Sequence, residues 1–363
     1  MKIMVFDVPA ESGGALSVLN DFYNDVRSAD DPDVRWSFVL GKAELEETER
    51  IEVLRFPWLK KSWIHRLYFD HIIAPRLVGK CKPDMILSLQ NVVVPHTKVF
   101  QVLYVHQSLP FVEFRFGIRE NFLFWVYQNL IGCLIFRSIK KADKVVVQTR
   151  WMKKACVEKT RVDESKIEVV PPRIAVEPKA FFEPTKDALS SFFYPAAPYS
   201  YKNHTLILDA CKQLVEQGHR DFRVVFSLYG DENEFARMLL KRSKSENLPI
   251  NFVGSLSREE VFDYYTRSIL LFPSYIETFG LPMLEARMHG TIILASDCAF
   301  SHEILDRYEN AHFFGPFDVG GASSLMRRAI MRNIIHVRNP LLFKKIYSDE
   351  SLLASLLGLQ TSL

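Results

Sequence analysis

Residues 269–290, ILLFPSYIETFGLPMLEARMHG, carry the pattern that decides the fold. Ile269–Phe272 is a short apolar run, typical of a strand that is buried on both faces of a parallel sheet. Pro273 ends the run, and Pro282 suits the first turn of a helix because its missing N–H is not needed there. The segment therefore predicts a strand, a loop and a helix at the carboxyl edge of an α/β sheet, where ligands bind.

The loop and the helix start hold groups that suit a sugar diphosphate. Glu277 lies on the loop and Glu285 in the expected first helical turn, so we expect both carboxylates to face one pocket. The N–H groups of Phe279, Gly280 and Leu281 would point at the same pocket, and a helix N-terminus attracts phosphate. Glycine also lets the backbone approach a ligand closely. The alternative is that the glutamates only complement the helix dipole.

Around this segment, apolar runs alternate with helical patterns, which predicts an α/β protein with mainly parallel sheets. In the first half we predict strands at Lys2–Asp7, Trp36–Leu40, Ile51–Phe56, Met85–Leu89, Val99–Val105, Lys144–Gln148 and Ile167–Val170. In the second half we predict strands at Phe192–Pro195, Arg223–Tyr229, Ile250–Val253, Ile269–Pro273 and Thr291–Ala295, with helices at His204–Gln217, Arg258–Ser268 and Pro282–His289.

The 363 residues are enough for about two domains. Pro171 and Pro172 stop regular structure, and the polar stretch from there to about Ser190 reads as an interdomain linker. We therefore predict a first domain over residues 1–172 and a second over 185–345, with a ligand site in a cleft between them.

The composition excludes several classes of protein. A net charge of +3 is too small to indicate a nucleic-acid partner, and no nucleic-acid module is recognisable. Met1–Phe6 runs into a strand without the pattern of a signal peptide, and the apolar run Phe122–Phe136 is shorter than a membrane span. The five cysteines are odd in number and scattered singly. These features favour a cytoplasmic protein without disulfides or a zinc site.

The central motif resembles that of a known family. ETFGLPMLEA, with Glu277 and Glu285 in an E-x7-E arrangement, looks like the donor-site signature of retaining glycosyltransferase family 4, E-x-F-G-L-P-x-x-E-A. Other segments that match the family are Gly13-Gly14, His106, Ala142–Val146, Lys202-Asn203-His204, Asn251–Gly254 and Ser296–Ile304.

The resemblance implies a GT-B fold, with two Rossmann-like domains facing across a cleft. The first domain would bind the acceptor and the second the donor, and a helix within residues 346–363 (Asp349–Gly358) would pack back on the first. The implied reaction is retaining transfer of a hexose-type sugar from a UDP- or GDP-sugar to a glycan or lipid-linked acceptor. The implied setting is capsule or O-antigen assembly, and the implied enzyme needs no metal or other cofactor.

The same resemblance implies roles for individual residues. Glu277 would orient the donor sugar, His106 would contact it near the reacting carbon, and Lys202 would neutralise the leaving diphosphate. The implied donor-binding set is Glu285 on the ribose, together with Phe279, Gly280, Leu281, Gly13, Gly14, Gly254 and Ser255.

One position departs from the family pattern. Ala197 stands where members usually place an arginine, five residues before the lysine, so Arg173, Lys141 or another group would have to supply that charge. Two alternatives therefore stay open. One is a catalytically impaired nucleotide-sugar-binding protein, and the other is a GT-B enzyme with another reaction, such as an epimerase.

Aromatic and apolar segments with basic flanks occur at Phe111–Phe116, Phe122–Phe136 and Pro57–Trp63. They fit core helices with solvated ends. They also fit a basic, aromatic surface on the first domain that touches anionic lipid headgroups at the cytoplasmic membrane face.

Overall fold

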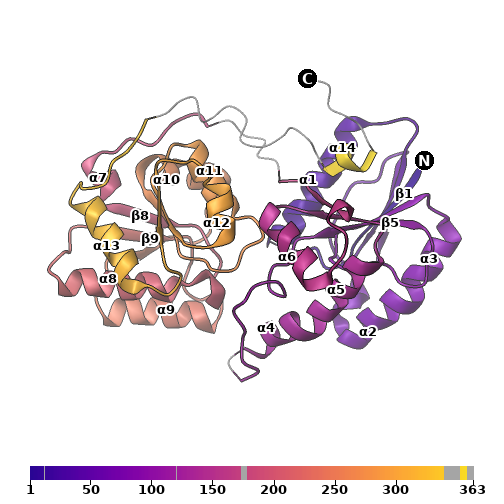
Figure 1. Cartoon of the computed structure of the whole chain (residues 1–363), viewed down its shortest axis with the longest axis horizontal. Coiled ribbons are helices and arrows are strands. Elements are labelled where there is room, and N and C mark those ends of the chain that lie inside the picture. The colour runs from indigo at the N-terminus through magenta and orange to yellow at the C-terminus, as the bar shows by residue number, and fades with distance from the viewer. Residues whose placement is uncertain (12, 120, 173–177, 339–351, 358–363) are drawn as a thin grey trace. The chain divides into compact units, whose positions relative to one another are not determined.

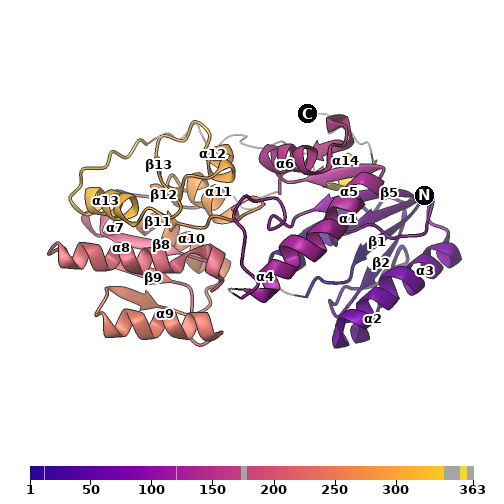
Figure 2. The ribbon, with the colours of Figure 1, turned by 60° about the horizontal axis from the view of Figure 1, so that its bottom comes forward.

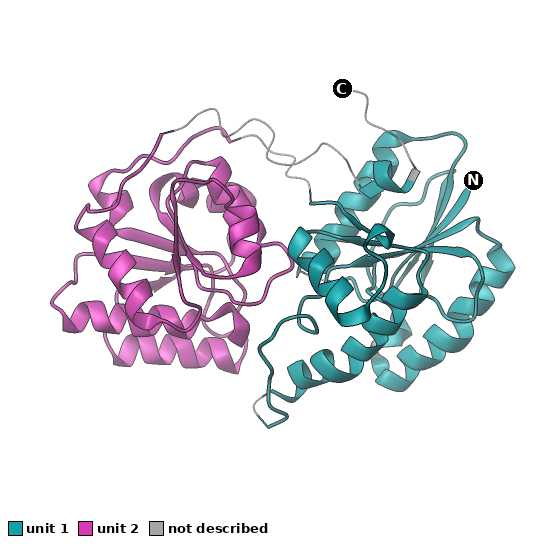
Figure 3. Ribbon diagram, viewed as in Figure 1, with its two compact units in different colours: residues 1–173, 347–363 teal, residues 174–346 magenta. Residues whose placement is uncertain are grey.

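The computed structural model describes all residues except 12, 120, 173–177, 339–351 and 358–363. The chain folds as two compact units, which are residues 1–173 with 347–363 (unit 1) and residues 174–346 (unit 2) (Figure 3). The linker was predicted too long. Phe182 is buried in unit 2 and its N–H donates to the His289 carbonyl at 2.8 Å, so the segment after it already belongs to that unit.

Unit 1 is built on a seven-stranded parallel sheet of order β3-β2-β1-β4-β5-β6-β7. Its strands are β1 Lys2–Asp7, β2 Arg35–Leu40, β3 Ile51–Arg55, β4 Met85–Ser88, β5 Phe100–Val105, β6 Lys144–Val147 and β7 Ile167–Val169. Each lies within one residue of its predicted bounds. β1 is flanked by β2 on one side and β4 on the other, so the strand order reverses between β1 and β4.

Helices cover both faces of this sheet (Figure 1). They are α1 Gly13–Ala29, η1 Pro57–Lys61, α2 Trp63–Tyr68, η2 Phe69–Ile73, α3 Ala74–Cys81, α4 Phe122–Val126, η3 Tyr127–Ile131, α5 Gly132–Lys141, α6 Arg150–Thr160, η4 Glu164–Lys166 and α14 Leu352–Leu357. α1 and α14 pack on one face, where Leu19 and Leu353 join the same core as Val5. Phe69 and Ile135 belong to cores on the opposite face.

Two long continuous helical segments, here called rods, lie on that opposite face. The first rod consists of α2, η2 and α3, and the second of α4, η3 and α5, each without a break in the chain (Figure 2). The second rod, Phe122–Lys141, has 20 residues and is long and apolar enough to cross a membrane by length and composition alone. The length argument from the run Phe122–Phe136 was therefore wrong. Because Phe124 and Ile135 are buried in unit 1, the rod also fits a helix packed on the sheet.

Unit 2 has a six-stranded parallel sheet of order β10-β9-β8-β11-β12-β13. Its elements are α7 Lys186–Leu189, β8 Ser191–Tyr194, η5 Ser200–Lys202, α8 His204–Glu216, β9 Arg223–Phe226, α9 Glu234–Ser245, β10 Ile250–Phe252, α10 Arg258–Arg267, β11 Ile269–Phe272, α11 Leu281–Met288, β12 Ile293–Ser296, α12 Ala299–Ile304, β13 Ala311–Phe314 and α13 Val319–Ile330. β13, α9, α12 and α13 were not predicted.

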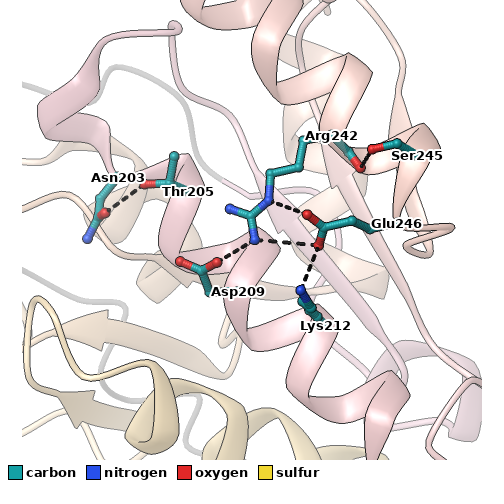
Figure 4. Close-up of polar contacts among 7 residues, drawn as sticks. All are labelled: Asn203, Thr205, Asp209, Lys212, Arg242, Ser245 and Glu246. Atoms are coloured by element: carbon teal, nitrogen blue, oxygen red, sulfur yellow. Dashed lines mark hydrogen bonds and ion pairs between the residues drawn. The ribbon is translucent and has the colours of Figure 1, made fainter.

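A charged network joins α8 to α9 (Figure 4). Arg242 on α9 contacts Asp209 on α8 at 2.5 Å and Glu246 at 2.8 Å, and Lys212 lies 3.9 Å from Glu246. Pairs this exposed contribute at most about 1 kcal/mol each. Their geometric effect is to fix α9 against α8, the helix that begins directly after the loop holding Lys202.

Candidate active site

In unit 2 the strand order reverses between β8 and β11. The loops that follow these two strands diverge, and such a point is where open α/β sheets bind ligands. Lys202 lies in the loop after β8 and Glu277 in the loop after β11. Their side chains meet, with Lys202 Nζ 2.5 Å from Glu277 Oε1, and are 19% and 14% exposed. The structure thus brings two of the predicted catalytic residues together at the sheet's carboxyl edge.

The Lys202 loop is held from several sides. The Tyr194 hydroxyl donates to the Lys202 carbonyl at 2.7 Å. Asn203 follows in the left-handed conformation, with φ of 58°, and starts α8. The Asn203 side-chain amide donates to the carbonyls of Pro273 and Pro316 at 3.4 and 2.7 Å. Lys202 is therefore tied to the end of β11, the strand that leads to Glu277.

The helix start after Glu277 has the predicted form. Gly280 has a φ of +97°, which disfavours any side chain there, and a Cβ atom would lie 2.6 Å from Met283 Cε. α11 begins at Leu281, with its first N–H groups at the same sheet edge. The Phe279 side chain is 2% exposed and belongs to the core, so only its backbone remains available to a ligand.

Glu285 was predicted to lie in the first turn of this helix. In the structure it is the fifth residue of α11 and lies just beyond that turn. Its carboxylate accepts from the Tyr265 hydroxyl at 3.2 Å and lies 3.4 Å from Arg258. Burial raises the pKa of Glu285, and the Arg258 charge and the Tyr265 hydrogen bond oppose that rise. Sequence reasoning missed Arg258 and Tyr265, because neither stands in a motif.

Gly254 and Ser255 follow β10. Gly254 has a φ of +79°, and a Cβ atom there would lie 2.4 Å from the Tyr229 ring, so the ring packs directly against the glycine. Ser255 is exposed. The loop ends at Ser257, which caps α10, and the first residue of that helix is Arg258. Gly254 and Ser255 thus connect to Glu285 through Arg258.

The remaining predicted residues belong to unit 1. The backbone N–H of His106, directly after β5, donates to Asn91 Oδ1 at 2.7 Å. Burial lowers the pKa of His106 to about 4, so its imidazole is neutral at pH 7. Gly13 and Gly14 open α1 directly after the β1 loop. A Cβ atom on Gly14 would meet nothing within 4 Å, so packing within unit 1 does not demand glycine there.

The position of the missing arginine is an exposed alanine, Ala197. Of the two substitutes considered from the sequence, Arg173 lies outside the described residues and Lys141 ends α5 in unit 1. Arg258 is a cation that unit 2 itself supplies to Glu285.

This arrangement has relatives among known proteins. Residues 178–335, which include Lys202, Glu277 and Glu285, match the family model of glycosyl transferases group 1. The matched residues span the strands β8 to β13 and therefore the whole sheet of unit 2.

The chain is similar to a curated protein, the O-antigen chain mannosyltransferase RfbU of Salmonella typhimurium, with 24% identity over 213 residues. The match covers 56% of this chain and 54% of the relative, so it spans about half of the relative's length.

Solved glycosyltransferase structures are similar over nearly the whole chain. The lipopolysaccharide outer core galactosyltransferase WaaB is 14% identical, with 92% of each chain covered and a TM-score of 0.67. Sucrose-phosphate synthase of Thermosynechococcus elongatus is 15% identical, covers 91% of this chain and 90% of its own, and has a TM-score of 0.67. HepE of Anabaena with UDP and glucose is 14% identical, with 92% and 90% covered and a TM-score of 0.64. These similarities confirm the GT-B fold predicted from the sequence.

Proposed function

We propose that the protein is a retaining glycosyltransferase that moves a hexose-type sugar from a UDP- or GDP-sugar to a glycan or lipid-linked glycan during cell-surface polysaccharide assembly. The pairing of Lys202 with Glu277 at the strand-order reversal of unit 2 carries the proposal. A donor that enters there would separate the pair. Lys202 would then contact the diphosphate, and Glu277 would contact the sugar hydroxyls. The mannosyltransferase name of the RfbU relative and the UDP-bound HepE support the class of donor and the setting.

The chemistry follows from charge. Breaking the sugar–phosphate bond places negative charge on the leaving diphosphate, and a fixed cation stabilises that charge in a site shielded from water. Lys202 offers this cation, and the N-terminus of α11 offers N–H groups beside it. Because the protein supplies both, we propose transfer without a metal ion. Retention would follow if the leaving phosphate assists deprotonation of the acceptor on the same face.

Donor binding is tested with UDP and GDP by calorimetry on the wild type and on Glu285→Gln. We expect one nucleotide to bind the wild type, and the variant to bind it at least about tenfold more weakly, because glutamine replaces one of the two acceptor oxygens with an NH2 donor and removes the charge. Tyr265→Phe, which removes one hydrogen bond to Glu285, should weaken binding less, and Glu259→Gln on the exposed start of α10 should leave it unchanged.

The same sample separates the two alternatives. A catalytically impaired binding protein would bind the nucleotide but transfer no sugar to any acceptor tested. An epimerase would convert the nucleotide sugar without an acceptor. Failure of both nucleotides to bind the folded wild type would contradict the proposal itself.

We also propose that unit 1 binds the cytoplasmic face of a membrane. Both rods on one sheet face carry large apolar side chains that are exposed. They are Trp63, Ile64, Leu67, Tyr68 and Ile72 on the first rod and Phe122, Leu123, Leu130 and Leu134 on the second. Exposed cations, among them Lys61, Arg76, Lys80, Arg137, Lys140 and Lys141, lie on or next to the same rods. This combination suits anionic headgroups above an acyl layer. Of the aromatic segments predicted from the sequence, Phe111 and Phe116 are instead buried.

Membrane binding is measured by sedimentation with phosphatidylcholine vesicles with and without phosphatidylglycerol. The double change Ile64→Glu with Phe122→Glu should lower the bound fraction at least about tenfold, since each side chain loses roughly 1.5–3 kcal/mol of burial. Met238→Glu, a similar change on exposed α9 of unit 2, is the control. Equal binding by all three proteins would contradict the proposal.

A further inference from the structure

A second group of polar side chains lies at the strand-order reversal of unit 1, between β1 and β4. Asp7 is the last residue of β1, and Gln90 stands just after β4. Arg66 on α2 donates to Gln90 Oε1 at 3.0 Å and to Asp70 Oδ2 at 2.7 Å. Asp70 belongs to η2, a π-helical turn, and such turns are frequent at functional sites.

The carboxylates of this group are only partly satisfied within the protein. Asp7 is fully buried, and the backbone N–H of Ala10 is directed at its carboxylate without closing a hydrogen bond of ordinary geometry. Asp70 Oδ1 has no hydrogen-bond partner among the described residues. Burial raises the pKa of Asp7 to about 7 and also raises that of Asp70, while the charge of Arg66 opposes both shifts. Buried polar atoms nearly always have a partner, from protein, water or ligand. Because the Asp70 side chain is 20% exposed and one of its oxygens is unpaired among the described residues, it indicates contact with a donor-bearing molecule, whereas Asp7 is connected to it through the charge of Arg66.

The group also adjoins a residue of the proposed reaction. Gln90, which accepts from Arg66, and Asn91, which accepts from the His106 N–H, are consecutive in the chain. Asn91 has a φ of 65° and lies in the turn after β4. His106 is the residue predicted to lie near the reacting carbon. The turn after β4 therefore contacts both Arg66 and the backbone of that residue.

We propose that Asp7, Arg66, Asp70 and Gln90 form the site for the hydroxyl groups of the acceptor sugar. This assignment rests on the proposed function. Arg66 and Asp70 are 23% and 20% exposed and would make the direct contacts. Asp7 lies behind them as a positioning residue that acts through Arg66. Sugar hydroxyls supply donors to the carboxylates and acceptors to Arg66, whereas an anionic group such as phosphate would meet two carboxylates against one arginine.

Binding is measured by saturation-transfer NMR with methyl glycosides of mannose, glucose, galactose and N-acetylglucosamine, and with inorganic phosphate as competitor. We expect saturable binding of at least one glycoside by the wild type. Asp70→Asn and Arg66→Met should each weaken it about tenfold, because a hydrogen bond to a charged group is lost. Asp33→Asn, on an exposed turn of unit 1, should not.

Nucleotide binding to unit 2 is measured on the same proteins and should change less than about twofold, since Asp70 and Arg66 belong to unit 1. Two results would overturn the site and leave the proposed function standing, provided that nucleotide binding is retained. One is that the wild type binds no glycoside, and the other is that the wild type and both variants bind it equally. Displacement of the glycoside by inorganic phosphate would overturn it in favour of an anion site. Loss of nucleotide binding in the wild type would instead reject the proposed function.

Discussion

Lys202→Met lowers the rate of sugar transfer by about 10²–10³-fold, the usual loss when one preorganised group that stabilises transition-state charge is removed. In the structure Lys202 Nζ lies 2.5 Å from Glu277 and its side chain is 19% exposed. The lost cation faces the leaving diphosphate, so the effect should fall on kcat more than on the KM for the donor. Both kcat and the KM for the donor are measured at saturating acceptor, so that the two effects are separated.

Two controls accompany this measurement. Lys212→Met makes the same change on α8, where the lysine is 49% exposed and 3.9 Å from Glu246, and should leave the rate unchanged. Lys202→Arg keeps the charge and should restore part of the rate. The wild-type rate should be the same in EDTA, because the proposed site uses lysine in place of a metal ion. If the Lys202→Met variant transferred sugar at the wild-type rate, Lys202 would have no part in the mechanism.

Asp7→Asn raises the free energy of unfolding, and the gain grows with pH. The pKa of Asp7 is raised from 3.8 to about 7 by burial. Between these values the unfolded chain has lost the proton that the folded protein keeps, so stability falls as pH rises from about 4 to 7 and is constant above. Each pKa unit corresponds to about 1.4 kcal/mol. Asparagine does not titrate, so its advantage should be larger at pH 8 than at pH 5 by about 3 kcal/mol.

The measurement is urea unfolding at pH 5 and pH 8, followed by tryptophan fluorescence. All five tryptophans of the chain lie in unit 1, so the signal reports the unit that contains Asp7. Asp33→Asn, with its carboxylate on an exposed turn, should show no such pH dependence. An Asp7→Asn protein that is less stable at both pH values would show that the carboxylate is satisfied in the folded state. A stabilising change that impairs glycoside binding would be the mark of a residue kept for function.

The strands could be predicted because those of a parallel sheet are buried on both faces and read as unbroken apolar runs, as Ile269–Phe272 does. β13, AHFF, was missed because it has only four residues, one of them a histidine. α9 was missed because five of the twelve residues in its sequence, EFARMLLKRSKS, are charged, although its apolar side chains fall on one face. The linker was overextended because Phe182 lies between Pro178 and Pro184 in a segment rich in charged residues.

The site could be predicted only where a motif carried it. Glu277 and Glu285 stand in one continuous segment, so spacing alone indicates a shared purpose. Arg258 and Tyr265 reach Glu285 from another helix, and no local pattern announces a contact between α10 and α11. Asp7 did leave a signal that was not used: it is a charged residue directly after the apolar run Ile3–Phe6, just before the glycine loop.

The position of α14 constrains how the protein is made. Leu353 and Leu356 belong to the same core as α1, and Lys144 donates to the Ser355 carbonyl at 3.3 Å. This helix leaves the ribosome after the whole of unit 2, although it completes unit 1. Unit 2 is continuous in sequence and can finish folding while it is being translated. Unit 1, which starts first, must wait with an open apolar face until its last helix emerges, and a nascent chain stalled within unit 2 would expose that face to chaperones.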